Sequence, residues 1–249
     1  MNLPPGRLRR WISDITVWTG TGPGDRLVRV PDARTALVVR RTRQGRCDLL
    51  VAGPRTRATY NTGKDLPFSL RLRLRPGAAL PLLGVGAGEL VDRVVGIGEL
   101  WPGSDDLVLR LFEAGTDAEL VLKHLESALL TRIAARTPAD LARSELVRAA
   151  AVALTRPSGQ GREPVPAIAR QLAVSERHLR GLFADDIGLP PKRFERIMRV
   201  RRVLANGRAS GWAAAGYYDQ SHMTAEFRAM MGVTPGAFFA GRLPTLQPC

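Results

Sequence analysis

Two stretches of the C-terminal part of the sequence decide the fold. Residues 168–194 read IARQLAVSERHLRGLFADDIGLPPKRF, and residues 213–239 read AAAGYYDQSHMTAEFRAMMGVTPGAFF. A shift of 44 residues brings identical residues into register, among them His178 and His222, Phe183 and Phe227, Gly188 and Gly232, Pro191 and Pro235, Phe194 and Phe238. Such an internal repeat indicates two tandem copies of one supersecondary unit.

The first copy predicts a helix, a tight turn and a second helix. A short helix over Val165–Leu172 is followed by a turn at Ala173-Val174, and Ser175 is a favourable N-cap for the next helix. Apolar residues at helical spacing give that second helix one buried stripe: Leu179, Leu182, Phe183 and Ile187. The outward face then carries Glu176, Arg177, His178 and Arg180.

The second copy predicts the same arrangement, with Asp219 as the N-cap. Its buried stripe comprises Met223, Phe227, Met230 and Met231, and its outward face carries Gln220, Ser221, Thr224 and Arg228. Both copies close on Gly-x-x-Pro, at 188–191 and 232–235, a pattern that ends one helix and begins another.

A basic helix over Lys192–Ala205 is expected to join the copies, with Phe194, Ile197, Met198 and Leu204 turned inward. Its fourteen residues would span roughly 21 Å. The two outward faces could then lie about 34 Å apart, one turn of DNA, and read two adjacent major grooves of a double helix. The alternative is a plain helical bundle with solvated polar faces, but the duplication, the caps and the Gly-x-x-Pro closings favour DNA recognition.

The first hundred residues predict strands. Short β-prone runs at Arg26–Val30, Thr35–Arg40 and Cys47–Ala52 are separated by turn residues. Residues 68–75, FSLRLRLR, alternate strictly, so Phe68, Leu70, Leu72 and Leu74 should face a core. Ser69, Arg71, Arg73 and Arg75 then point the other way. We expect this arginine row to be a solvated face, with an anionic effector or DNA phosphate as the alternative.

Helical patterns begin near residue 104. Ser104 is the expected cap of a helix over Asp105–Ala114, and Thr116 with Glu119 forms a capping-box pattern for a helix reaching Ala135. Thr137-Pro138 begins a helix that ends near Thr155. The glycine-rich residues 84–88, GVGAG, lack the remaining residues of a dinucleotide or phosphate-binding loop, so a flexible connection is expected there.

These patterns predict an α+β protein of two domains. Residues 1–136 form a mainly β N-terminal domain with following helices. Residues 137–249 form an all-α domain of two helix-turn-helix units joined by a linker helix.

Composition narrows the class of protein. The 249 residues carry 37 Lys and Arg against 23 Asp and Glu, a formal charge of +14, which favours polyanionic partners. Residues 1–160 hold 24 basic and 16 acidic residues, and residues 161–249 hold 13 basic and 7 acidic residues. The positive charge is therefore spread over both halves and does not indicate where a binding face lies.

The sequence also predicts what the protein lacks. No apolar run is long enough to span a membrane and no secretory leader precedes Arg7, so we expect a cytoplasmic protein without a membrane partner. Two cysteines, Cys47 and Cys249, and three scattered histidines predict no metal site, no cofactor and no catalytic residues.

The repeat resembles the paired helix-turn-helix domain of AraC/XylS-type transcriptional regulators over roughly residues 140–245. The second copy is the more specific part, because it contains GYYDQSH followed by F and GVTP at the family's spacing. The resemblance implies promoter binding by double-stranded DNA contacts and an N-terminal domain that senses a small-molecule effector or mediates homodimerisation. The N-terminal half looks like an accessory domain of one branch of these regulators, on the basis of the stretches VPDARTALVV, VAGP, LRPGAA and ELVDRVVGIGELW.

The family's base and phosphate contacts fall on specific positions here. In the first unit they are Glu176, Arg177, Arg180 and Gly181, and in the second they are Gln220, Ser221, Thr224, Ala225 and Arg228. Ser175, His178 and His222 complete the set of candidate DNA-binding residues. One departure is the short stretch Trp212–Ala215 before Gly216, where the family has a full two-turn helix.

Two other functions stay open at this stage. A DNA-repair or methyl-transfer enzyme could carry such a DNA-binding module, but it would need a cysteine cluster that Cys47 does not supply. A degenerate regulator or interaction protein could have lost specific binding through the shortened helix near Trp212, and it would bind DNA only in a salt-sensitive, non-specific way.

Overall fold

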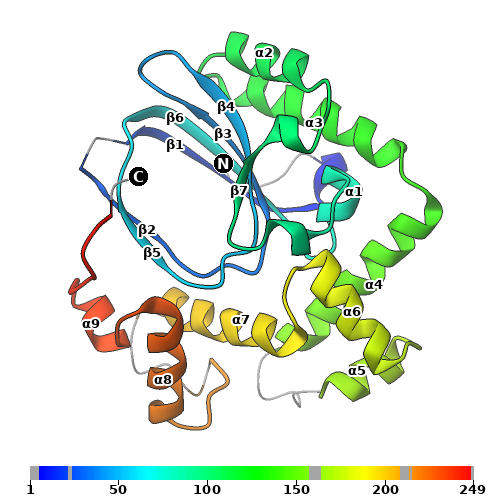
Figure 1. The fold of residues 1–249 in the computed structure, drawn as a ribbon, viewed down its shortest axis with the longest axis vertical. Helices are drawn as coiled ribbons and strands as arrows, with labels where there is room; N and C mark the ends of the chain where they lie inside the picture. The colour runs from blue at the N-terminus through cyan, green and yellow to red at the C-terminus, as the bar shows by residue number, and fades with distance from the viewer. Residues whose placement is uncertain (1–5, 22–23, 157–163, 208–212, 214, 248–249) are drawn as a thin grey trace.

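The computed structural model describes residues 6–21, 24–156, 164–207, 213 and 215–247. Its N-terminal half is built on a five-stranded antiparallel sheet with the order β1-β6-β3-β4-β7 (Figure 1). These strands are β1 (Ile12–Thr21), β6 (Leu66–Leu74), β3 (Ala36–Arg41), β4 (Cys47–Ala52) and β7 (Val94–Gly96). A separate two-stranded ribbon pairs β2 (Arg26–Arg29) with β5 (Thr59–Thr62).

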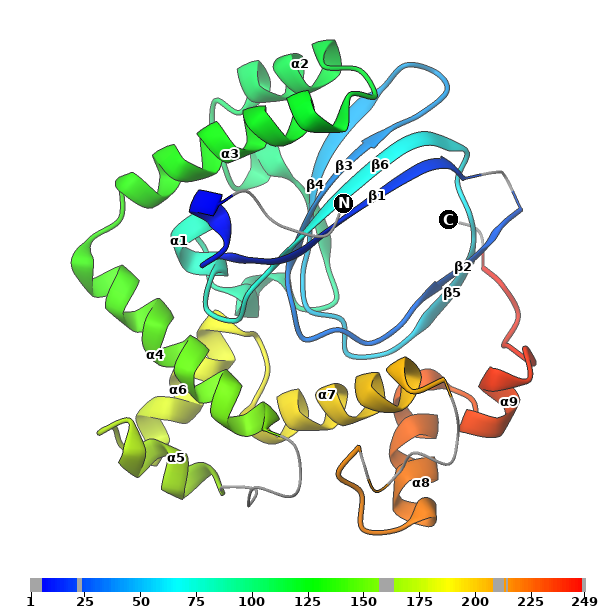
Figure 2. The ribbon, with the colours of Figure 1, turned by 180° about the vertical axis from the view of Figure 1, so that it is seen from behind.

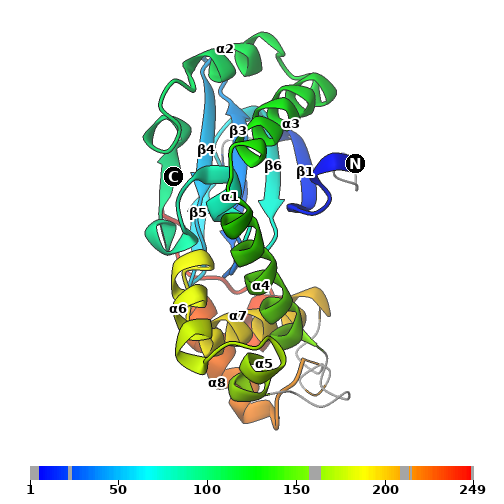
Figure 3. The ribbon, with the colours of Figure 1, turned by 90° about the vertical axis from the view of Figure 1, so that its right-hand side faces the viewer.

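Helices cover one face of the sheet. Figure 3 shows α1 (Ala79–Leu83), α2 (Asp105–Glu113) and α3 (Ala118–Ala134) beside it. The predicted apolar side of β6 is buried against them, because Phe68, Leu70, Leu72 and Leu74 belong to one core with residues of α1, α2 and α3. Since β6 pairs with β1 and β3, its alternation sets the inward face of all three strands.

Where it is described, the C-terminal half has helices as its main regular elements. Its helices are α4 (Pro138–Thr155), α5 (Val165–Gln171), α6 (Glu176–Asp186), α7 (Pro191–Ala205), α8 (Gln220–Met231) and α9 (Pro235–Phe239). They surround a second core cluster, which takes in Ala33 of the N-terminal half. Figure 2 shows α3 and α4 as the connection between the two halves. The fold class is therefore the expected α+β arrangement.

The arginine row of β6 is not the solvated face that the alternation suggested. Arg71, Arg73 and Arg75 are only partly exposed. Arg71 stacks on the ring of Trp18 at 4.7 Å, and burial lowers its pKa to about 10. Arg73 is ion-paired with Asp14 and Asp32, each at 3.1 Å. Alternation identified the apolar side, but the partners of the other side come from distant parts of the chain.

Two expected helix caps also differ. The N-cap of α3 is Asp117 rather than Thr116, because the Asp117 carboxylate accepts hydrogen bonds from the backbone N–H groups of Glu119 and Leu120. Ser104 lies at the N-cap of α2 but makes no side-chain cap hydrogen bond. Thr137 is the expected cap of α4, in a capping box with Asp140.

Residues 84–88 pack closely instead of forming a flexible connection. Gly84 ends α1 with φ +88°, and the glycines that follow it lie against the C-terminal end of α6. A Cβ atom placed on Gly86 would lie 2.4 Å from the carbonyl oxygen of Asp185, and one on Gly88 would lie 2.7 Å from that of Ala184. The glycines are therefore needed for close approach between the two halves.

Candidate nucleic-acid interface

The first helix-turn-helix unit has the predicted elements. The α5 helix ends at Gln171, and Ala173 takes a left-handed conformation with φ +54°, which closes the turn. The Ser175 hydroxyl then accepts a hydrogen bond from the backbone N–H of His178 at 3.1 Å. This cap orients α6, whose apolar stripe is buried and whose Phe183 contacts Phe194 of α7 edge to face at 5.6 Å.

The second unit repeats this construction. Asp219, 44 residues after Ser175, caps α8 by accepting a hydrogen bond from the backbone N–H of His222 at 2.7 Å. Met223, Phe227, Met230 and Met231 are buried, as the stripe predicted. Gly188 and Gly232 end the two helices with φ +79° and +73°, so the two copies share their left-handed stop as well as their caps.

Helix α7 joins the units over one residue more than expected. It begins at Pro191 and ends at Ala205. Phe194 and Ile197 are buried as predicted, whereas Met198 and Leu204 are only half-buried. Figure 1 shows α6 and α8 at opposite ends of α7.

A buried ionic cluster attaches α8 to α7. Arg199 of α7 is ion-paired with Glu226 of α8 at 2.7 Å, and Arg196 reaches the same carboxylate at 2.8 Å. The Tyr217 hydroxyl donates a hydrogen bond to Glu226 at 2.8 Å, and its ring lies under the Arg199 guanidinium. Sequence analysis missed this cluster, since the amphipathic pattern assigned Glu226 no partner.

The cluster holds its members in their charged or protonated forms. Burial alone would raise the pKa of Glu226, but the hydrogen bonds from Arg199, Tyr217 and Arg196 outweigh it and lower that pKa. Burial and the nearby Glu226 carboxylate raise the pKa of Tyr217. Tyr217 therefore stays a hydrogen-bond donor at neutral pH.

The candidate contact residues lie on the outer surface of the two units. Glu176 and Thr224 are half-buried, and the others are exposed: Ser175, Arg177, His178, Arg180 and Gly181 in the first unit, and Gln220, Ser221, His222, Ala225 and Arg228 in the second. Arg180 donates to the Glu176 carboxylate at 2.8 Å, one helical turn away. The N-terminal half leaves both candidate faces uncovered.

The short stretch before α8 lies in part outside the described residues. Residues 208–212 and 214 are not described, and the departure from the family pattern at Trp212–Ala215 falls partly on them. Between Ala205 and Gln220, the residues that are described form turns and no helix.

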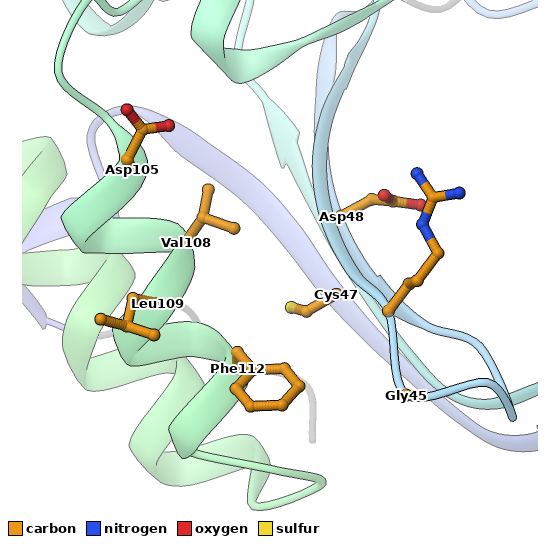
Figure 4. Close-up of a pocket in the computed structure, with 8 residues that line it drawn as sticks. Gly45, Cys47, Asp48, Asp105, Val108, Leu109 and Phe112 are labelled. Atoms are coloured by element: carbon orange, nitrogen blue, oxygen red, sulfur yellow. The ribbon is translucent and has the colours of Figure 1, made fainter.

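A hollow near Cys47 is a second place where chemistry could occur (Figure 4). It has a volume of about 430 Å³ and lies between the β3–β4 turn and α2. Burial raises the pKa of the Cys47 thiol, which disfavours the nucleophilic thiolate. Over the described residues, no group of three or more His, Cys, Asp or Glu side chains is placed to hold a metal ion.

No helix in the described ranges is long and apolar enough to cross a lipid bilayer.

Comparisons with known proteins agree with the helix-turn-helix assignment. Residues 168–241 match a family model described as a helix-turn-helix domain. No curated protein matches the chain.

Similar solved structures include two of ToxT from Vibrio cholerae. Wild-type ToxT with a bound unsaturated fatty acid is 10% identical, with a TM-score of 0.46 over 99% of this chain and 100% of that one. ToxT bound to (E)-4-(8-methylnaphthalen-1-yl)but-3-enoic acid is 11% identical, with a TM-score of 0.46 over 91% and 98%.

Proposed function

We propose that the protein is a sequence-specific transcription regulator of the AraC type, a proposal supported by the match of residues 168–241 to a helix-turn-helix family model. In this proposal α6 and α8 enter two adjacent major grooves of one DNA duplex. The observation that carries it is the duplicated unit, in which two capped helices present uncovered polar faces from opposite ends of α7.

The proposed contacts are the residues that the sequence singled out. Ser175, Glu176, Arg177, His178, Arg180 and Gly181 would meet one groove, and Gln220, Ser221, His222, Thr224, Ala225 and Arg228 the next. Arg side chains read guanine edges and phosphates, and Gln reads adenine. The fifteen residues of α7 span about 22 Å, which supports a separation near one DNA turn once the flanking helices are added.

The proposal includes a division of labour between the halves. Residues 137–249 would bind DNA, and residues 1–136 would sense an effector or mediate homodimerisation. Two separate core clusters support this division. The cytoplasmic location and the absence of catalysis remain predictions from sequence.

Site selection followed by footprinting tests this function. The full chain is used to select binding sites from random double-stranded DNA, and hydroxyl-radical cleavage then maps the protected backbone. We expect two protected patches about one helical turn apart on one side of the duplex, and binding at least about 10³-fold tighter than to scrambled DNA. A single patch would contradict the two-groove part of the proposal.

The same experiment distinguishes the proposed function from the alternative of a degenerate regulator or interaction protein that has lost specific DNA binding. A protein that has lost specific recognition selects no sequence and binds every duplex with similar, strongly salt-dependent affinity. That result would overturn the proposed function as a whole.

A further inference from the structure

Among the contacts that join the DNA-binding half to the N-terminal half, three bear directly on the two helix-turn-helix units and the helix between them. One attachment holds the first helix-turn-helix unit, one holds α7, and one holds the second unit. Figures 1 and 2 show both ends of α7 close to the N-terminal half, near α6 on one side and near the β2–β5 ribbon on the other.

The first attachment is the glycine contact at α6. Gly86 has φ −70°, a conformation open to any residue, so only the nearness of Asp185 excludes a side chain there. From the other side, a Cβ atom on Gly188 would lie 2.7 Å from the carbonyl oxygen of Ala87. Backbone therefore packs against backbone, which leaves the C-terminal end of α6 little freedom to slide or tilt.

The second attachment is an ionic cluster around Asp32. Arg201 of α7 contacts the Asp32 carboxylate at 3.0 Å and donates to the carbonyl oxygen of Pro31 at 3.2 Å. Arg73 of β6 and Arg34 contact the same carboxylate at 3.1 and 3.2 Å. Since the side chain of Asp32 is only 14% exposed, its charge depends on these partners from both halves.

The third attachment joins the β2–β5 ribbon to the end of α8. The Tyr60 hydroxyl donates a buried hydrogen bond of 2.6 Å to the carbonyl oxygen of Met231. The backbone N–H of Ala58 donates to the carbonyl oxygen of Met230 at 2.8 Å. These bonds satisfy carbonyl groups in the last turn of α8, which have no partners within the helix.

We propose that these attachments fix the orientation of the two recognition helices relative to each other, so that the N-terminal half determines which half-site spacing the chain accepts. The inference rests on the proposed function. One inserted base pair moves the second half-site by about 3.4 Å and turns it by about 35°. A pair of units held only by α7 could follow that shift by bending, whereas units held at both ends and in the middle cannot.

The same attachments could instead hold the DNA-binding half away from DNA. The geometry argues against this alternative. The attached residues, Asp185, Met230 and Met231, lie at the C-terminal ends of α6 and α8, whereas the candidate contacts begin at the N-terminal ends and reach only Arg228. Those contact faces are exposed while all three attachments are made.

The test compares spacing preference in the wild-type chain and in loosened variants. The probes are the selected site and duplexes with one or two base pairs inserted or removed between its half-sites. The double substitution Gly86→Ala and Gly88→Ala places methyl groups against α6 at positions without a left-handed φ, so the contact with α6 itself must open. Gly98→Ala is the matched control, because its Cβ atom would meet no atom closer than 3.9 Å.

A second variant loosens the other two attachments. Asp32→Asn removes the charge that Arg201 contacts, and Tyr60→Phe removes the hydroxyl that contacts Met231, so both are combined in one chain. Circular dichroism and thermal unfolding establish that each variant is folded. Because the glycine variant and this variant act at different places, either one alone is sufficient to decide the outcome.

We expect the wild-type chain and Gly98→Ala to lose about 30-fold or more in affinity when one base pair is inserted. The loosened variants should lose about threefold or less in affinity for the same duplex, which is less than the usual cost of one mismatched base pair. An equal gain in affinity at every spacing, or a spacing profile unchanged from the wild type, would overturn the inference. Failure of the wild-type chain to select any site would instead count against the proposed function.

Discussion

At the residue scale, Glu226 is the side chain on which the second unit depends most. It is almost fully buried and bonded to Arg199, Arg196 and Tyr217. Glu226→Gln leaves the buried Arg199 without its counter-charge, so we expect a loss of about 3 kcal/mol in the free energy of unfolding at pH 7. Urea unfolding measures it, with the exposed Glu113→Gln as a control of near-zero effect.

The pH dependence of that loss follows from the lowered pKa of Glu226. A carboxyl with a lower pKa in the folded state stabilises the protein above its unfolded pKa, about 4.3, and loses this contribution as the pH falls through the folded value. The difference between wild type and Glu226→Gln should therefore shrink below about pH 4. A difference that stays constant down to pH 3 would show that the charge of Glu226 is not its source.

Two arginines on the outward faces should differ in their effect on DNA binding. We expect Arg180→Ala to weaken binding to the selected site by about tenfold or more, the usual size of a lost base contact, and Arg228→Ala to weaken it less. The reason is the departure from the family pattern before α8, together with the pairing of Arg180 with Glu176, which holds the guanidinium in place. Gel-shift titrations at fixed salt compare them, and equal losses would contradict the expectation.

At the scale of the element, the N-caps decide how well the recognition helices begin. Ser175→Ala and Asp219→Ala each remove an acceptor for a backbone N–H in the first turn, at a cost of about 1 kcal/mol in unfolding free energy. Ser104→Ala should cost clearly less through helix capping, because Ser104 makes no cap hydrogen bond. Chemical denaturation of the three variants measures the difference. Comparable losses in all three would mean that capping is not the cause.

The elements also show how far the sequence predicts this fold. The helices of both units, their caps and their buried stripes follow from local spacing and capping chemistry, so they could be predicted from Ser175, Asp219 and the apolar residues alone. The partners of Arg73, Arg201 and Glu226 could not. Each depends on residues brought together by tertiary packing, and periodicity reports only that a face is polar, not what it meets.

The glycines of residues 84–88 illustrate the same limit. Their rhythm, without the other residues of a phosphate-binding loop, predicted a flexible connection, and composition could not distinguish flexibility from close approach. The contact with α6 involves two segments about a hundred residues apart in sequence. No local signal in either segment identifies the other.

At the scale of the whole molecule, the charge of +14 is spread over both halves, so only part of it can face DNA. Arg73, Arg143, Arg199 and Arg201 are neutralised in ion pairs within the protein, so they add no free positive charge to the DNA-binding surface. If every net charge met a phosphate, the logarithm of affinity would fall against that of salt with a slope of about −12; the exposed cations of the two units predict about −5. A salt titration on a non-specific duplex measures this slope, and a value near −12 would refute the prediction.

The backbone contact between Gly86, Gly88 and the end of α6 has a practical consequence for protein engineering. A chimaera that grafts residues 137–249 onto a foreign sensory domain would meet ordinary side chains where this protein has hydrogens. The grafted segment would then pack against the new domain at a different angle. Its DNA-binding response to the effector would change although both parts fold. Grafts of this kind should carry residues 84–91 with them.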